Sequence, residues 1–293
     1  MSRRRKKKVG ILPAILLVLA LALFAYYYMD QLSQDDSLPT ITADSSLVMR
    51  VIDVGQGDSI LLCCDNEYML IDCGEKHEVG SVLEQLDGIK NLKYLVATHP
   101  HTDHMGGVVS VMKTIKPQLF LMPEKEHTSL AFKEMLDTIE ELNIDAAYAY
   151  AGDKYYLGSA RITIISPEEG AKESNLNNNS VVMLVEYGDV SILLTGDAEI
   201  KMEKEYIKYL KGKVDIFKVA HHGSDTSNGE ALLYRIKPTY SVISVGEGNK
   251  FDHPIKSVLN LLDRYSGKVY RTDESGCVTF TVKEGEISVT TQR

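Results

Sequence analysis

The chain has 293 residues, of which 41 are acidic and 32 are basic. Six of the basic residues fall within the first eight positions, so the rest of the chain carries 26 basic against 41 acidic residues, a net charge of −15. Nucleic-acid binding draws on clustered lysine and arginine. The net negative charge therefore argues against a general polyanion binder, although it does not exclude a local basic patch.

The first thirty residues predict a membrane anchor. Residues 3–8 form an uninterrupted basic block, and residues 9–29 contain no charged side chain. About 20 apolar residues suffice for a helix to cross a bilayer, and a basic flank stays in the cytoplasm. We therefore expect a cytoplasmic segment at 1–8, a single-pass transmembrane helix at 9–29, and a cell-membrane protein whose C-terminal domain lies outside. A signal peptide cleaved near the Ala-Leu-Ala of residues 20–22 is the alternative.

Residues 30–46 are polar and without periodicity, which is typical of a linker. Hydrophobic runs and turn residues divide residues 47–293, a plausible single domain, into short elements. Strands are predicted at 47–54, 59–64, 68–72, 94–98, 119–122, 155–157, 160–166, 180–187, 190–195, 216–220, 240–245, 268–271, 277–282 and 287–290. Helices are predicted at 79–86, 105–115, 130–142, 199–210, 228–236 and 255–265. Each half opens with a strand hairpin and continues with strand–helix alternation, which favours an α/β fold, a four-layer αββα sandwich.

The densest group of metal-binding side chains lies at 98–107, THPHTDHMGG, directly after a predicted apolar strand. His99 and His101, two residues apart in extended backbone, project to the same side and can hold one ion. Asp103 and His104, on the turn that follows, can hold a second. Imidazole and carboxylate groups suit Zn²⁺ and similar divalent ions. The four cysteines form no C-x-x-C pair, so the sequence does not indicate a cysteine zinc site.

Two distant strand ends offer further ligands. Asp197 ends the segment Leu-Leu-Thr-Gly-Asp, at the end of a predicted buried strand. Its carboxylate can bridge the two ions or, alternatively, cap the helix that follows. His221 and His222 come at the end of the strand predicted at 216–220. We expect His221, the first to leave the strand, to be the metal ligand and His222 to face the substrate. The reverse assignment stays open.

Taken in order, the HxHxDH block, the TGD at 195–197 and the HHGS at 221–224 resemble the metallo-β-lactamase fold. Three further segments narrow the resemblance to the hydrolase domain of ComEC-type competence proteins and their stand-alone relatives. They are the DVGQGDS at 53–59, the Asn-Asn-Ser at 178–180 and the His-Pro at 253–254. The match covers nearly the whole predicted domain.

The resemblance implies roles for residues around the ligands. Asp58 and Asp72, near strand ends, would orient ligand imidazoles. A segment that includes Asn178 and Ser180 would face the first ion. Asn249 and His253 would lie near the substrate, with His253 at its leaving group or phosphate.

Two departures from the family pattern bear on the site. Many ComEC domains have Asp where this chain has His101, and the histidine favours metal loading. The superfamily also supplies a histidine from the middle of the chain, whereas here only His127 lies between the HxHxDH block and His221. The first ion is therefore expected to have fewer strong ligands, and β-lactam hydrolysis is disfavoured.

The resemblance implies a two-metal hydrolase, with Zn²⁺ expected and Mn²⁺ as the alternative, and the predicted anchor places it outside the cytoplasm. Asp103 would orient the attacking hydroxide, and His222 or His253 would protonate the leaving oxygen. The implied substrates are phosphodiesters, with DNA the natural candidate. Because the domain is acidic, smaller esters, such as those of choline phosphate or other cell-wall groups, are the alternative substrates. A non-catalytic metal-binding surface module is the alternative from another class.

Overall fold

The computed structural model describes residues 46–293, which belong to one compact unit. The predicted basic segment, the predicted anchor and all but the last residue of the predicted linker lie outside the described residues. Within 46–293, no helix has both the length and the apolarity needed to cross a membrane.

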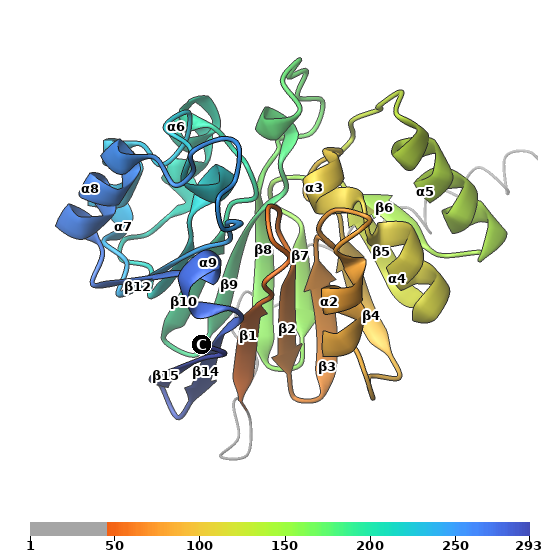
Figure 1. Cartoon of the computed structure of the whole chain (residues 1–293), viewed down its shortest axis with the longest axis horizontal. Coiled ribbons are helices and arrows are strands. Elements are labelled where there is room, and N and C mark those ends of the chain that lie inside the picture. The colour runs from red at the N-terminus through yellow and green to blue at the C-terminus, as the bar shows by residue number, and fades with distance from the viewer. Residues whose placement is uncertain (1–45) are drawn as a thin grey trace, which may run out of the picture. The chain divides into compact units, whose positions relative to one another are not determined.

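Two sheets form the centre of the described domain (Figure 1). The first has eight strands in the order β15-β14-β1-β2-β3-β4-β5-β6. Its members are β1 (Leu47–Val51), β2 (Ile60–Cys64), β3 (Glu67–Ile71), β4 (Leu92–Val96), β5 (Pro117–Met122), β6 (Ala146–Tyr148), β14 (Val278–Lys283) and β15 (Glu286–Thr291).

The second sheet has seven strands in the order β13-β12-β11-β10-β9-β8-β7. Its members are β7 (Lys154–Leu157), β8 (Ala160–Ser166), β9 (Val182–Tyr187), β10 (Val190–Leu194), β11 (Ile216–Lys218), β12 (Tyr240–Ile243) and β13 (Lys268–Arg271). In each sheet an antiparallel run turns parallel, at β3 in the first and at β10 in the second. The predicted repetition of hairpin and strand–helix alternation is thus confirmed.

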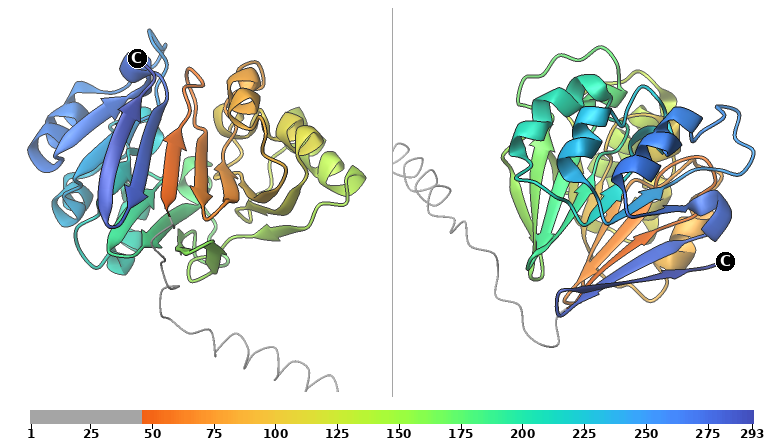
Figure 2. Two further views of the ribbon diagram at one scale, coloured as in Figure 1. Left: turned by 90° about the horizontal axis from the view of Figure 1, so that it is seen from below. Right: turned by 90° about the vertical axis from the view of Figure 1, so that its left-hand side faces the viewer.

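Helices cover the outer faces of both sheets (Figures 1 and 2). The helices of the first half are α2 (Val79–Gln85), α3 (Thr102–Met105), α4 (Val108–Thr114) and α5 (Leu130–Glu141). Those of the second are α6 (Ile200–Tyr206), α7 (Glu230–Ile236), α8 (Lys256–Tyr265) and α9 (Thr272–Ser275), with 3₁₀ turns η1 (Asn177–Asn179), η2 (Ile207–Tyr209) and η3 (Ala220–Gly223).

Three apolar clusters fill the spaces between these layers. The first lies between the two sheets and joins side chains such as Leu62 of β2 to Ile164 of β8. The second packs Phe132 of α5 and its neighbours on the first sheet, and the third packs Tyr206 of α6 and its neighbours on the second. Buried and half-buried residues alternate along β1, as the two-residue period of a strand requires. The four-layer α/β arrangement agrees with the prediction.

The helix predicted at 105–115 begins later, as α4 at Val108, and a separate short helix that was not predicted, α3, ends at Met105 before Gly106 and Gly107. A Cβ on Gly107 would lie 2.4 Å from the carbonyl oxygen of Cys73, and one on Gly106 would lie 2.6 Å from the amide nitrogen of Lys76. Only glycine lets the backbone come this close to the segment after β3. The short strand β6 and helix α9 were not predicted.

The parallel strands place the candidate ligands at one edge of each sheet. Asp72 follows β3, the HxHxDH block follows β4, Asp197 follows β10 and His221 follows β11. The carboxyl ends of parallel strands meet at the same edge of a sheet, which is where ligands bind in open α/β folds.

Candidate metal centre

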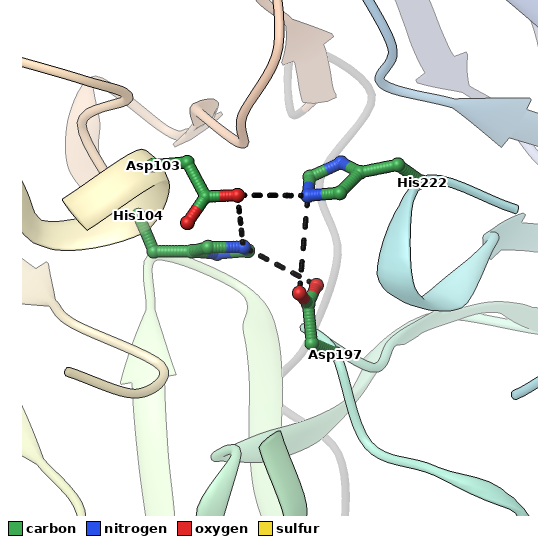
Figure 3. Close-up of side chains that lie close together, drawn as sticks. All are labelled: Asp103, His104, Asp197 and His222. Carbon is green, nitrogen blue, oxygen red and sulfur yellow. Dashed lines mark ion pairs between the residues drawn. The ribbon is translucent and has the colours of Figure 1, made fainter. Parts of the chain in front are cut away.

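Four side chains from three separate segments converge at the carboxyl ends of the strands (Figure 3). Asp103 and His104 lie on α3, Asp197 follows β10, and His222 follows β11. His104 Nε2 lies 3.2 Å from Asp197 Oδ1, and His222 Nε2 lies 3.3 Å from Asp103 Oδ2. One ligand atom from each residue lies within 4.8 Å of the other three, which is close enough to share a single ion.

Asp197 also faces a second group of histidines. Its Oδ2 atom lies 3.8 Å from His99 Nε2 and 3.7 Å from His221 Nε2. His101 Nδ1 is in turn 3.0 Å from His99 Nε2. The carboxylate of Asp197 therefore contacts two sets of potential ligands, one of which contains His104 and the other His99.

Local backbone chemistry explains the shape of the HxHxDH segment. His101 has extended backbone and forms the N-cap of α3, so the chain turns into the helix inside the motif. The carbonyl oxygen of Asp103 accepts a hydrogen bond of 3.1 Å from the amide of Asp58. A Cβ on Gly57, whose φ is +146°, would lie 2.4 Å from that same oxygen. Gly57 is thus required for the DVGQGDS segment to pack against Asp103.

The turn at His221 and His222 sends the two rings to different ligand sets. Both residues have left-handed backbone, with φ of +50° and +54°, and their ring centroids are 6.1 Å apart. Left-handed non-glycine residues cost about 1–3 kcal/mol each and collect at functional sites. The sequence predicts His221 as a ligand because this residue leaves the strand first. The turn carries His222 into the group of four, while the His221 side chain, 22% exposed, lies beside Asp197.

A buried carboxylate holds the ring of His104. Asp72 Oδ2 lies 2.8 Å from His104 Nδ1, and the same carboxylate accepts hydrogen bonds from the amide and the hydroxyl of Thr98. The second nitrogen of the ring, Nε2, consequently points at Asp197. Asp58, Asp72 and His104 form another close group, but its carboxylates are engaged by Lys218 and Thr98, so this group supports the ligands from behind.

Hydrogen bonds to a carbonyl and a hydroxyl also hold the rings of His222 and His221. His222 Nδ1 donates to the carbonyl oxygen of Ser244 at 3.0 Å, and His221 Nδ1 lies 3.1 Å from the hydroxyl of Thr226. Each contact leaves Nε2 free to face the carboxylates. Neither Ser244 nor Thr226 can be recognised from the sequence as a partner of these rings. A backbone carbonyl leaves no mark in the sequence, and a lone threonine is an ordinary loop residue.

Lys218 is a fully buried cation next to the cluster. Its Nζ atom lies 2.9 Å from Asp58 Oδ2, with both side chains at most 2% exposed. Asp58 was expected to orient a ligand imidazole, and its Oδ1 atom does lie 3.5 Å from His222 Nδ1. The ring nitrogen, however, makes its hydrogen bond to Ser244, and the ion pair with Lys218 is the shorter contact of Asp58. A lysine inside the apolar run Ile-Phe-Lys-Val-Ala was the sequence signal for this pair, because lysine is rarely buried unpaired.

Asn178 and Ser180 contact the loop of Asp197. The hydroxyl of Ser180 accepts a hydrogen bond from the amide of Asp197 at 3.1 Å. The side-chain amide of Asn178 accepts from the amide of Glu199 and donates to its carboxylate, both at 3.2 Å. These residues were expected to face the first ion, but their hydrogen bonds fix the backbone that presents Asp197.

The loop after β12 carries Asn249 and His253 to the rim of the cluster. Asn249 Oδ1 accepts hydrogen bonds of 3.1 Å from the amides of Phe251 and His253, and its Nδ2 donates to the carbonyls of Gly246 and His253. The ring of His253 lies edge-on to that of His221, with centroids 5.6 Å apart. Asn249 therefore organises the loop, and His253 lies one ring away from the Asp197 carboxylate.

Burial and neighbouring charges set the protonation states of the cluster. Burial lowers the pKa of His99 well below its usual value, and it lowers the pKa of His101 as well. Burial alone would raise the pKa of Asp197, but the charge of His104 helps to hold it well below its usual value. Burial opposes a charge on His104, yet Asp197 raises its pKa well above the usual value. The cluster thus favours ionised carboxylates and a positive charge between them, which a bound cation would supply in place of a proton.

The unsatisfied atoms of the cluster fit a metal ion. Among residues 46–293, His104 Nε2, Asp197 Oδ1 and His222 Nε2 are buried and have no hydrogen-bond partner. A buried polar atom without a hydrogen bond costs about 1–3 kcal/mol, so a cation bound among these three atoms would stabilise the cluster. Imidazole nitrogen and carboxylate oxygen are the donors that Zn²⁺ and related ions prefer. The cluster is therefore capable of binding metal ions.

The two-sheet sandwich with this cluster at its strand ends is shared with a known family of proteins. The family model of the metallo-beta-lactamase superfamily matches residues 52–247, and the chain belongs to that superfamily. ComE operon protein 3 of Bacillus subtilis is 31% identical over 84% of this chain, and Recombination protein 2 of Haemophilus influenzae is 32% identical over 78%. The resemblance to ComEC-type competence proteins is thus confirmed.

The chain spans only about a third of the length of these curated relatives, 34% of the first and 28% of the second. Among solved structures, the metallo-beta-lactamase fold protein YhfI from Bacillus subtilis superposes with a TM-score of 0.53. The alignment covers 84% of this chain and all of YhfI at 11% identity. At that identity the likeness supports the fold alone.

Proposed function

We propose that the chain is an extracytoplasmic phosphodiesterase that uses two divalent metal ions, most simply Zn²⁺, with Mn²⁺ as the alternative. The observation that carries the proposal is the position of Asp197 between two sets of ligands. His99, His101 and His221 with Asp197 would hold the first ion. Asp103, His104 and His222 with Asp197 would hold the second. In this assignment His221 binds the first ion and His222 binds the second. His221 thus takes the place of the histidine that the superfamily supplies from the middle of the chain.

Two bound cations would supply an activated water nucleophile and neutralise the charge that grows on the phosphoryl oxygens. The protein would contribute orientation and proton transfer. Asp103, which is partly exposed, would accept a hydrogen bond from the attacking water. His253, at the rim beside His221, would donate a proton to the leaving oxygen or steady it.

DNA is the proposed substrate class. Recombination, the process in the name of the Haemophilus influenzae relative, handles DNA, and so does competence, the process in the name of a further relative, Competence protein ComA of Neisseria gonorrhoeae. The net negative charge of the chain after its first eight residues disfavours a long duplex held along a basic track. We therefore propose a short stretch or an end of a single strand as the reacting form.

The test is metal content and turnover by the purified full-length protein. We expect about two metal ions per chain and hydrolysis of bis(p-nitrophenyl) phosphate and single-stranded DNA. Bound metal with no hydrolysis of any ester would refute the enzyme and favour a non-catalytic metal-binding module.

The variant Asp197→Ala should lose turnover together with one of the metal ions, because this carboxylate is shared by both ligand sets. Metal content by mass spectrometry and ester hydrolysis are measured on the same sample. Glu141→Ala, which removes an exposed carboxylate at the end of α5, is the matched control. Turnover retained by Asp197→Ala would refute the shared role.

A smaller cell-wall ester is the second candidate, favoured by acidic residues near the cluster. Glu75 and Glu78 line the same cleft as Asp103, and carboxylates suit a quaternary ammonium better than a polyanion. Choline-phosphate esters therefore belong in the substrate panel. Faster hydrolysis of these esters than of DNA would make them the substrate class.

The proposed location outside the cytoplasm rests on the basic block and the apolar run of the first 29 residues. Protease added to intact cells should cleave the domain, while a cytoplasmic marker protein stays whole. Protection of the domain until the cells are lysed would contradict the proposed orientation.

A further inference from the structure

A cleft of about 420 Å³ opens beside the proposed second ion site. Asp103 forms part of its wall, and the loop after β12 contributes Lys250 and Phe251. A substrate with its phosphorus at the cluster would extend its next group into this cleft, because Asp103 belongs to both.

Phe251 presents an aromatic ring to this cleft. It is 49% exposed, which is unusual for a phenylalanine whose loop is otherwise held tightly by Asn249. Its ring stacks on that of His253, with centroids 5.7 Å apart and planes 24° apart, and His253 lies edge-on to His221. Consecutive contacts thus lead from the Phe251 ring in the cleft, through the rings of His253 and His221, to the Asp197 carboxylate.

The charges of the cleft restrict what this ring can recognise. Lys250 Nζ lies 5.0 Å from the centre of the Phe251 ring, and it is the only lysine or arginine among the described residues that line the cleft. Glu75 and Glu78 lie in the same wall and repel phosphates beyond the one at the cluster. Affinity for a longer strand must therefore come from an uncharged contact, and every nucleobase offers a flat face for stacking.

We propose that Phe251 is a stacking platform for the nucleobase next to the scissile phosphodiester, with Lys250 contacting the phosphate or sugar on that side. The inference rests on the proposed function, and it makes single-stranded nucleic acid the preferred ligand over small phosphate esters. Phe251 acts in binding and specificity, apart from the metal ligands.

The test is binding of two matched oligomers by the full-length protein loaded with Zn²⁺. One is a fluorescently labelled oligothymidylate of eight nucleotides with phosphorothioate linkages, and the other has the same backbone without bases. The wild type should bind the thymidylate about tenfold more tightly, since one base–aromatic stack contributes on the order of tenfold in affinity. Phe251→Ala and Phe251→Leu should lose this discrimination, and Phe251→Tyr should keep it.

Tyr234→Ala, at an exposed ring on α7 outside the cleft, is the control and should leave the discrimination unchanged. Equal affinity of the wild type for the two oligomers would overturn the inference, as would unchanged discrimination in Phe251→Ala. Hydrolysis of bis(p-nitrophenyl) phosphate, measured alongside, tests the proposed function separately. Turnover without base-dependent binding refutes only the stacking site, and base-dependent binding without turnover refutes only the hydrolase.

Discussion

The ring of His104 depends on a single buried carboxylate. Asp72 lies 2.8 Å from its Nδ1 atom and is itself fixed by two hydrogen bonds from Thr98. A carboxylate behind a ligand histidine fixes the orientation of the ring and raises its basicity. Asp72 would therefore affect metal binding, although it contacts the His104 ring and would not contact the ion.

Asp72→Asn should weaken binding of the second metal ion by about 10- to 100-fold, because the amide keeps the shape but not the charge behind His104. Competition with a coloured zinc chelator measures the change, and Asp87→Asn, an exposed acid after α2, is the control. Unchanged affinity in Asp72→Asn would show that Asp72 supports only the fold.

At the scale of elements, the ion pair of Lys218 and Asp58 joins the two sheets below the cluster. Lys218 ends β11 of the second sheet, and Asp58 precedes β2 of the first. Asp58 also donates its amide to Asp103, and Lys218 lies four residues before His222. The pair therefore couples the segments that carry two of the four clustered residues.

Lys218→Met should destabilise the domain by about 3–5 kcal/mol, because it leaves the Asp58 carboxylate buried without a cation. The double variant Asp58→Asn/Lys218→Met removes both charges and should recover much of that loss. Urea denaturation gives the free energies of unfolding. A single variant as stable as the wild type, or a double variant no better than the single one, would contradict a charge-compensating role.

The Glu203 side chain on α6 makes the stability of the domain depend on pH. Its carboxylate is buried and accepts hydrogen bonds from the amides of Asn228 and Gly229, just before α7. Burial raises its pKa from 4.5 to about 7, although these amides lower it. The folded chain therefore binds this proton more tightly than the unfolded chain. Its contribution to stability is greatest below pH 4.5 and falls as the pH rises to about 7.

Relative to Glu203→Gln, the wild type should lose on the order of 3 kcal/mol of stability between those two pH values. The glutamine retains an oxygen acceptor for the two amides, so the comparison isolates the charge. Denaturation curves of both proteins across the pH range provide the measurement. A constant difference between the two proteins would show that Glu203 titrates normally.

For the molecule as a whole, the arrangement of strands and helices could be predicted from the sequence, whereas most side-chain contacts of the site could not. The two-residue alternation in β1 and the apolar strands β4, β10 and β11 located the sheets, and the strand ends located the ligand segments. The choice between His221 and His222 could not be made from sequence, because it depends on two successive left-handed residues. Neither could the partners of Asn178 and Ser180, because these are long-range contacts.

The ion pair of Lys218 could be predicted only in part. The charged residue inside a buried strand was visible in the sequence, but its partner Asp58 is distant in the chain and belongs to the other sheet. Pairing of this kind follows from how the two sheets face each other, which local patterns do not contain.

We have proposed that two cations are held around the Asp197 carboxylate. Anomalous X-ray scattering at the zinc edge, from crystals of the zinc-loaded protein, would locate them. We expect two peaks that share Asp197, one among Asp103, His104 and His222 and the other beside His99 and His101. An ordered cluster without a peak, or zinc bound only elsewhere on the protein, would contradict it.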